Sequence, residues 1–213
     1  MVAVIGPFTS DCSQTEVPIL NRAPRGPLAA ISPSSTYTGL TRSGPGAAPD
    51  EPARYAPTGR RSFLRLLAPD DVQGAADAGL AQRLGIRTVF VLSDGGLYGE
   101  GVAAAFRGVA RRLGLPVAGT GSMGGGRRIV RRVRASGAEG VFLGGYLLPF
   151  GPRLIRALRR AVPSAQLLAP DGFVSGIVET TGPAADGLTV SVLGVPVTAL
   201  PGRADGSSGA SAP

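Results

Sequence analysis

The stretch IRTVFVLSDGGLYGEG, residues 86–101, joins an apolar run, a turn rich in glycine and the start of an alanine-rich segment. An apolar run bounded by turn residues is typical of a buried strand, and the alanines that follow favour a helix. The stretch therefore predicts a strand at 88–92 and a helix at 100–113. Tyr98 lies at the tip of this strand, where its side chain can face a small ligand.

The same alternation of strands and helices continues outward from this stretch. We expect strands at 2–8, 28–31, 62–67, 116–119, 140–144, 166–169 and 187–193. We expect helices at 13–21, 70–84, 127–135, 151–162 and 175–180. This alternation predicts an α/β fold with parallel sheets covered on both faces. In such sheets ligands bind beyond the carboxyl ends of the strands, so polar residues at the strand tips are the candidates for a site.

Composition excludes several classes of protein. The chain has 213 residues, no histidine and a single cysteine, Cys12. Sites of the Ser-His-Asp or Cys-His type, His-containing metal sites, zinc-cysteine clusters and internal disulfides are therefore excluded. We predict no catalytic residue, no metal and no cofactor. The longest apolar stretch, around 140–151, is too short for a membrane-spanning helix, which needs about 20 residues.

The net charge of +8 does not by itself indicate a nucleic-acid partner. Every basic residue is arginine, and alanine, glycine and proline are abundant, a pattern that fits GC-rich codons. We therefore expect no nucleic acid. The arginines between 127 and 134 alternate with apolar residues at helical spacing, which predicts an amphipathic helix with a solvated basic face.

Two segments are predicted to lie outside packed elements. Residues 43–59 are dense in proline and glycine without periodicity, which indicates a surface loop or linker. Residues 202–213 are of low complexity, which predicts a disordered tail. The start, MVAVIGPFTSD, has no secretory signal as written and opens directly into an expected strand, so we favour a start inside a longer protein.

Six stretches, taken together, resemble one family. They are VIGPFTSDCSQ (4–14), AAISPSSTYTGLT (29–41), SFLRLLAPDDVQGAADA (62–78), VFVLSDGGLYGEG (89–101), GVFLGGYLLPFG (140–151) and QLLAPDGF (166–173). In order and spacing they resemble the branched-chain amino acid (leucine) binding family, the type I periplasmic substrate-binding proteins of ABC transporters. The resemblance implies two Rossmann-like lobes with parallel sheets, joined by crossing strands, that close on a ligand between them.

The resemblance also implies an organisation of the chain in which lobe one is incomplete. Residues 1–66, with the loop at 43–59, would form part of the first lobe. Residues 67–193 would form the second Rossmann-like lobe, and 194–213 a hinge remnant with the disordered tail.

On the first lobe, the resemblance places three residues on the charged head of the ligand. Ser10 would bind the α-carboxylate through its hydroxyl and backbone N–H. Ser34 through its carbonyl, and Thr36 through its hydroxyl and N–H, would hold the carboxylate and ammonium. Taken without the family, the hydroxyls of Ser10 and Thr36 are more typical of a helix cap or a turn than of a ligand contact.

On the second lobe, the resemblance places two aromatics and one acid opposite these residues. Tyr98 and Tyr146 would close over the ligand, and Asp171 would pair with its ammonium. Asp171 is shorter than the glutamate frequent at this position, which leaves room for a water or a larger ligand. Before glycine it is also an ordinary turn residue, and Tyr146 could simply cap the edge of the sheet.

The function that the resemblance implies is capture of a small amino acid or related zwitterion, with an ABC permease or a fused signalling domain as partner and an extracytoplasmic location. A ligand-sensing domain of a receptor or kinase is one alternative. A nucleotide-using Rossmann-like enzyme with residues 119–126 at the phosphates is another, although that loop lacks both established glycine patterns for phosphate binding.

Overall fold

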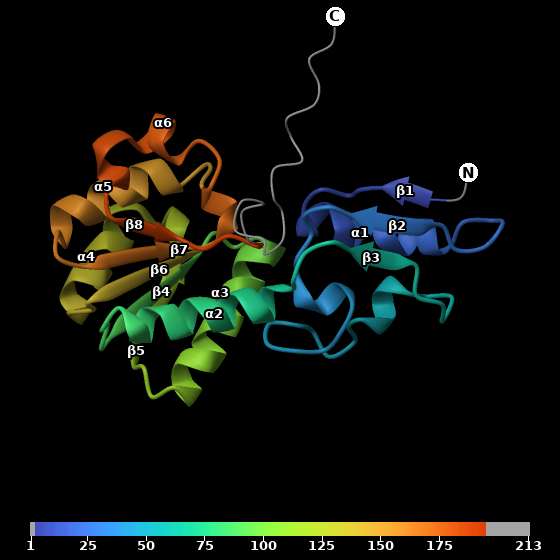
Figure 1. Cartoon of the computed structure of the whole chain (residues 1–213), viewed down its shortest axis with the longest axis horizontal. Helices are drawn as coiled ribbons and strands as arrows, with labels where there is room; N and C mark the ends of the chain where they lie inside the picture. Colours follow the sequence, from blue (N-terminus) through green and yellow to red (C-terminus); the bar gives the residue numbers. More distant parts are fainter. Residues whose placement is uncertain (1–2, 195–213) are drawn as a thin grey trace, which may run out of the picture.

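The computed structural model describes residues 3–194 and confirms the predicted α/β fold with parallel sheets. Two separate sheets lie in two bodies beside each other (Figure 1). The strands are β1 (Ala3–Ile5), β2 (Ala29–Ser32), β3 (Phe63–Arg65), β4 (Val89–Ser93), β5 (Val117–Ser122), β6 (Gly140–Gly144), β7 (Gln166–Ala169) and β8 (Leu188–Val190). The helices are α1 (Ser10–Asn21), α2 (Asp70–Arg83), α3 (Leu97–Arg112), α4 (Gly126–Ser136), α5 (Gly151–Ala161) and α6 (Ile177–Thr181). Every expected element exists, with ends shifted by a few residues.

The larger sheet has the strand order β5-β4-β6-β7-β8 and is covered on both faces. Alternate residues of β4 point to opposite sides, as the pleat of a strand requires. Phe90 and Leu92 pack in the core beneath α4 and α5, whereas Val89 and Val91 pack with α2 and α3. This two-sided burial explains why the sequence of β4 is apolar throughout rather than alternating.

The smaller sheet has the order β1-β2-β3, and α1 covers one of its faces. There Val17 of α1 packs in one cluster with Ala30 and Phe63 of the sheet. α1 begins at Ser10, three residues before the expected start, because the Thr9 hydroxyl accepts the N–H of Cys12 at 3.2 Å and caps the helix.

The opposite face of the smaller sheet carries an uncovered apolar row. Ile5 is paired in register with Ile31, and Ile31 with Leu64, so the three side chains share one face. Ile5 is 85% exposed and Leu64 58% exposed. Within the described residues, this sheet is therefore covered on one side only.

α2 follows β3 directly and packs along α3, so it connects the smaller sheet to the larger body (Figure 1). The two helices approach closely at Gly74. A Cβ atom there would lie 2.7 Å from the Cβ of Ala105 and 2.7 Å from the backbone nitrogen of Phe106. Only glycine fits at this crossing without movement of one helix.

Residues 43–59 lie at the surface outside strands and α-helices, as the sequence predicts, but the segment is packed at two buried residues, Glu51 and Tyr55. The carboxylate of Glu51 is buried and accepts hydrogen bonds from the hydroxyls of Tyr37 at 2.7 Å and Tyr55 at 2.6 Å. It also accepts the N–H of Ala48 at 2.7 Å and pairs with Arg54. Proline and glycine set the turns of this segment, but a buried carboxylate packs it against the smaller sheet.

The glycine-rich stretch at 119–126 is also more regular than expected. β5 runs to Ser122, a 3₁₀ turn follows at Met123–Gly125, and α4 begins at Gly126. The predicted disordered tail at 202–213 lies outside the described residues, as does all but Gly194 of the expected hinge remnant.

Within residues 3–194, no helix is long and apolar enough to cross a membrane. In the same residues, no group of three acidic, cysteine or histidine side chains is placed to hold a metal ion.

Candidate functional site

Ser10 and Thr36 lie together at the carboxyl ends of β1 and β2. The buried hydroxyl oxygen of Ser10 accepts the backbone N–H of Thr36 at 3.2 Å and that of Tyr37 at 3.1 Å. These bonds leave the hydroxyl proton of Ser10 free to reach another acceptor. Ser10 is also the first residue of α1, where backbone N–H groups and the helix dipole favour an anion.

Ser34 lies in the same turn but is bonded differently. Its N–H donates to the Ser32 hydroxyl at 3.3 Å, and its side chain is half-buried. The adjacent Ser35 turns inward, and its hydroxyl lies 2.6 Å from that of Ser13. Ser35 therefore holds the turn to α1, whereas the Ser34 side chain stays partly exposed.

Tyr98, Asp171 and Tyr146 form a second group, on the larger body. The Tyr98 hydroxyl donates to Oδ1 of Asp171 at 2.5 Å, and the rings of Tyr98 and Tyr146 lie 4.9 Å apart. Burial, and then the nearby charge of Asp171, raises the pKa of Tyr98 well above its ordinary value. Tyr98 therefore stays a hydrogen-bond donor that holds the carboxylate in place.

Asp94 fixes the backbone that carries Tyr146, a role that the sequence did not reveal. Its carboxylate accepts the N–H of Tyr146 at 2.8 Å and that of Gly96 at 2.9 Å. Gly145 has a φ of 137°, and a Cβ on it would lie 2.3 Å from the carboxyl of Asp94. Burial raises the pKa of Asp94 above its usual range, and the two N–H donors oppose that rise.

Asp70 is the most informative residue that the sequence-based prediction missed. An acid at the start of a helix is ordinarily explained by the helix dipole, yet the side chain of Asp70 is fully buried. Neither carboxylate oxygen has a hydrogen-bond partner among the described residues. Burial raises its pKa to about 7, with the charge of Asp171 acting in the same direction and Thr36 and Arg65 opposing it. A buried carboxyl without a hydrogen-bond partner, beside the strand ends that carry Ser10 and Thr36, is a candidate for ligand contact.

Asp70 brings the two groups of residues together. Its backbone N–H donates to the carbonyl of Thr36 at 2.9 Å. Its carboxyl is close enough to Tyr98 and Asp171 to affect their electrostatics. Thr36 and Ser10 thus lie beside Asp70, and the charge of Asp70 also acts on Tyr98 and Tyr146. Ser34 is bonded within its own turn.

One further hydrogen bond joins the two bodies beside this site. Oδ1 of Asp11, in the first turn of α1, accepts the backbone N–H of Leu97 at 2.9 Å. α3 begins at Leu97 and has no side-chain cap from its own N-cap residue, Gly96. Asp11 therefore caps a helix of the opposite body.

The fold consists of two α/β bodies with parallel sheets and a cluster of polar residues at the strand ends, and the sequence matches a known family. The profile of the family described as periplasmic binding protein matches residues 29–205. The chain belongs to this family, whose description denotes an extracytoplasmic location.

Individual relatives are amino acid binding proteins. The chain is 29% identical over 185 residues to an amino acid binding protein of Pseudomonas aeruginosa. The aligned region covers 84% of this chain and 44% of that protein. It is 27% identical over 140 residues to the leucine-, isoleucine-, valine-, threonine- and alanine-binding protein of the same organism, covering 63% of this chain and 37% of the relative. The chain therefore spans less than half the length of these relatives.

Solved structures share the fold. The leucine binding protein LivK of Thermotoga maritima matches with a TM-score of 0.73 at 24% identity, over 89% of this chain and 50% of that one. An ABC transporter substrate-binding protein of Desulfitobacterium hafniense in complex with leucine matches with a TM-score of 0.65 at 21% identity, over 88% and 50%.

Proposed function

We propose that this chain forms the central part of a solute-binding protein for a small amino acid of the branched-chain type, which supplies an ABC transporter. The observation that supports the proposal is the presence of carboxyl groups and hydrogen-bond donors near one another at the strand ends of the two bodies. Asp70 and Asp171 provide negative charge, and the free hydroxyl proton of Ser10 lies at the start of α1.

A set of carboxyl groups near a set of hydrogen-bond donors suits a zwitterion as ligand. An ammonium needs a carboxylate acceptor, and a carboxylate needs convergent donors. We propose that Asp171 and Asp70 bind the ammonium, and that Ser10, Ser34 and Thr36 bind the carboxylate end. Tyr98 and Tyr146 would place their rings against the side chain of the ligand, because aromatic faces provide apolar contact with a polar edge.

The raised pKa of Asp70 supports this role for its side chain. Its carboxyl is half protonated near pH 7, and a bound ammonium would favour the ionised form. Above pH 7 the Asp70 carboxyl would already carry the negative charge that pairs with the ammonium. At lower pH, binding of the ammonium would require this carboxyl to release a proton. Affinity is expected to fall as the pH drops below about 7.

We also propose that residues 1–66 are part of a first lobe that is completed by further chain, and that 67–193 are the second lobe. The support is the uncovered row Ile5, Ile31 and Leu64, together with the half-length coverage of relatives. Binding by this chain alone would be weak, since lobe closure draws contacts from both halves.

The wider assignments are proposals of the same kind. An ABC permease is the proposed partner, with a fused signalling domain as the alternative in a receptor. A purely binding role, without catalysis, fits a site of hydroxyls, carboxyls and tyrosines that holds no general base paired with a nucleophile.

A thermal-shift series tests the proposed function. Leucine, isoleucine, valine and alanine, titrated to tens of millimolar, should raise the melting temperature of the chain, with ATP and acetate as comparison ligands. Asp171→Asn should remove the response to leucine. The exposed Asp186→Asn is the matched control and should retain it.

Two results would contradict the proposal. One is stabilisation by ATP alone, which would favour the nucleotide-using enzyme. The other is a folded chain, as judged by circular dichroism, that no amino acid stabilises at any concentration in the series.

A further inference from the structure

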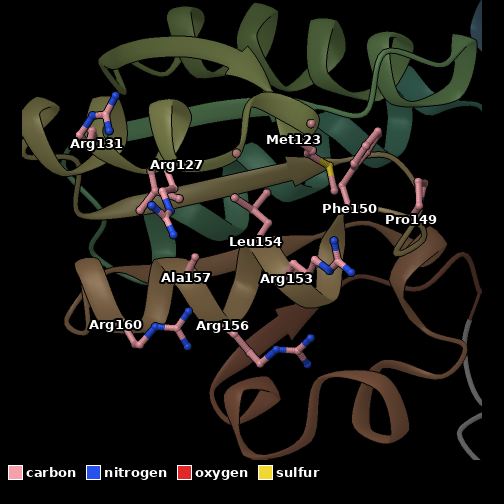
Figure 2. A pocket seen from close by; sticks show the side chains of 13 residues that line it. Met123, Arg127, Arg131, Pro149, Phe150, Arg153, Leu154, Arg156, Ala157 and Arg160 are labelled. Atoms are coloured by element: carbon pink, nitrogen blue, oxygen red, sulfur yellow. The ribbon is translucent and has the colours of Figure 1, made fainter.

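A groove with a cationic rim lies between α4 and α5, on the face of the larger sheet opposite α2 and α3. It encloses about 960 Å³ and is separate from the cluster around Asp70. Its apolar lining includes Val130, together with Met123, Leu154 and Ala157 (Figure 2). This region differs from an ordinary solvated helix face, because arginines of two helices line the same groove.

Five arginines line this groove, and no acidic residue does. Arg127 and Arg131 stand on the α4 wall, and Arg153, Arg156 and Arg160 on the α5 wall (Figure 2). Within the described part of the chain, none of the five forms a salt bridge. Like charges gathered without counter-charges repel one another, so an anionic partner would be stabilised here.

The arrangement of these charges favours an extended occupant. At 1.5 Å per helical residue, Arg153 and Arg160 are about 10 Å apart along α5, and Arg127 and Arg131 about 6 Å apart along α4. A single carboxylate or phosphate would engage one or two guanidinium groups and leave the others unpaired. Carboxylates three or four residues apart on a helix are separated by about 5–6 Å, which matches the rows.

The shape and the apolar floor narrow the chemistry further. A flat bilayer surface does not enter a groove between two helices, whereas an amphipathic segment places apolar side chains on the floor and acidic ones at the rim. Single-stranded nucleic acid relies on several stacking aromatics. The only aromatic side chain that lines this groove is Phe150, at one end.

We propose that the groove between α4 and α5 is a docking site for an acidic amphipathic segment of a partner protein. The five arginines would pair with its carboxylates, and Val130, Leu154 and Ala157 would contact its apolar side. The site is independent of amino acid binding around Asp70.

Fluorescence anisotropy with the full chain tests this proposal. The probe is a labelled helical peptide with glutamates four residues apart beside a leucine stripe, and the comparison peptide has glutamine at each glutamate. The acidic peptide should bind, the glutamine peptide should bind at least tenfold more weakly, and added salt should weaken the acidic peptide's binding.

A matched pair of α4 variants locates the binding. Arg127→Glu with Arg131→Glu reverses two charges that line the groove, and Arg128→Glu with Arg134→Glu reverses two exposed charges on the same helix that do not. Both pairs lower the net charge from +8 to +4. The first should weaken peptide binding roughly tenfold or more, and the second less than threefold.

If the first pair fails to fold, Arg153→Gln with Arg160→Gln on α5 replaces it, with the same expected loss. Equal weakening by both α4 pairs would overturn the proposal, since general charge would then explain binding. It would also be overturned by absent peptide binding, or by binding only to phosphatidylglycerol vesicles or an oligothymidine strand.

Discussion

The two sheets of this molecule are stabilised in different ways. The larger sheet is enclosed by helices on both faces, and its core consists of aromatic and aliphatic side chains. The smaller sheet has an exposed apolar face, and its buried contacts include a carboxylate network around Glu51. The comparison indicates that packing dominates stability in the larger body, and that buried hydrogen bonds carry a greater share in the smaller one.

The largest effect is expected from a change in the core of the larger body. Phe142 of β6 stacks on Phe106 of α3 with ring centroids 4.3 Å apart. Phe142→Ala should lower the free energy of unfolding by about 3–5 kcal/mol, because it removes this contact and leaves a cavity. Urea unfolding followed by circular dichroism measures the loss.

The control for this change is Leu66→Ala in the smaller body. Leu66 is 73% exposed, so its truncation should alter stability by less than about 0.5 kcal/mol. Comparable losses for the two variants would show that Leu66 is covered in solution, and would contradict the proposed difference between the two bodies.

The next effect concerns the buried carboxylate of the smaller body. Glu51→Gln should cost about 2–3 kcal/mol, since hydrogen bonds to a charged group are the stronger ones. Limited proteolysis should then cut within residues 43–59 before it cuts the larger body. Uniform cutting along both bodies would argue that they unfold as one unit.

The pH dependence of Glu51 sharpens this test. Burial acts to raise its pKa, but the hydrogen bonds from Tyr55, Tyr37 and Ala48 outweigh burial and the pKa lies below its ordinary value. A carboxyl of this kind contributes stability above its unfolded pKa and loses it as pH falls through the folded value. Acid should therefore open the proteolytic site in the parent chain, and Glu51→Gln should lack this dependence.

Substitution of Asp77 in α2 is expected to have a smaller effect, and to raise the free energy of unfolding rather than lower it. Its carboxyl is buried, one oxygen lacks a partner among the described residues, and burial raises its pKa from 3.8 to about 7. The Asp77 carboxyl ionises at lower pH in the unfolded chain than in the folded one. It therefore lowers the free energy of unfolding progressively between about pH 4 and pH 7, and by its full amount above pH 7. Asp77→Asn should thus stabilise by about 1–3 kcal/mol at pH 8 and by little at pH 4.

Melting curves at the two pH values measure this gain. A stabilisation at pH 8 that persists unchanged at pH 4 would contradict the titration and point to packing. Gln73→Leu, at a neighbouring buried position on α2, is the control, because it removes a polar group without changing charge.

The smallest effect is expected at the hydrogen bond between the two bodies. Asp11→Ala removes the cap of α3 at Leu97 and should cost about 1 kcal/mol. Asp11→Asn, which keeps an acceptor oxygen, should cost less. Hydrogen exchange of the backbone amides at the start of α3 measures the difference. If Asp11→Ala and Asp11→Asn give equal exchange rates there, the cap does not join the two bodies in solution.

Much of the fold was predictable, because strand and helix periods are local properties. The apolar run at 88–92 and the alanines after it define β4 and α3 without knowledge of the rest of the chain. The early start of α1 was missed, although Thr9 is an ordinary capping residue. The packing of 43–59 was missed because a proline-rich composition does not reveal that Glu51 is buried beneath two tyrosines.

The candidate site was predictable only in part. The resemblance pointed to Tyr98 and Asp171, and the structure brings the two into a direct hydrogen bond. Asp70 and Asp94 were missed, because an acid at a helix start or before a glycine turn has a sufficient local explanation. Their burial depends on α3 and on Gly145, which are brought near by tertiary structure alone.

The close crossing of α2 and α3 at Gly74 has a mechanical consequence. α2 follows the smaller sheet and packs along α3. The orientation of the smaller body relative to the larger one therefore depends on this contact between the two helices. A methyl group at residue 74 would push α2 away from α3 and tilt it slightly. The resulting displacement of the smaller body would increase with distance from this contact, toward Ser10. Gly74→Ala is thus a way to alter the angle between the bodies without touching any residue of the site.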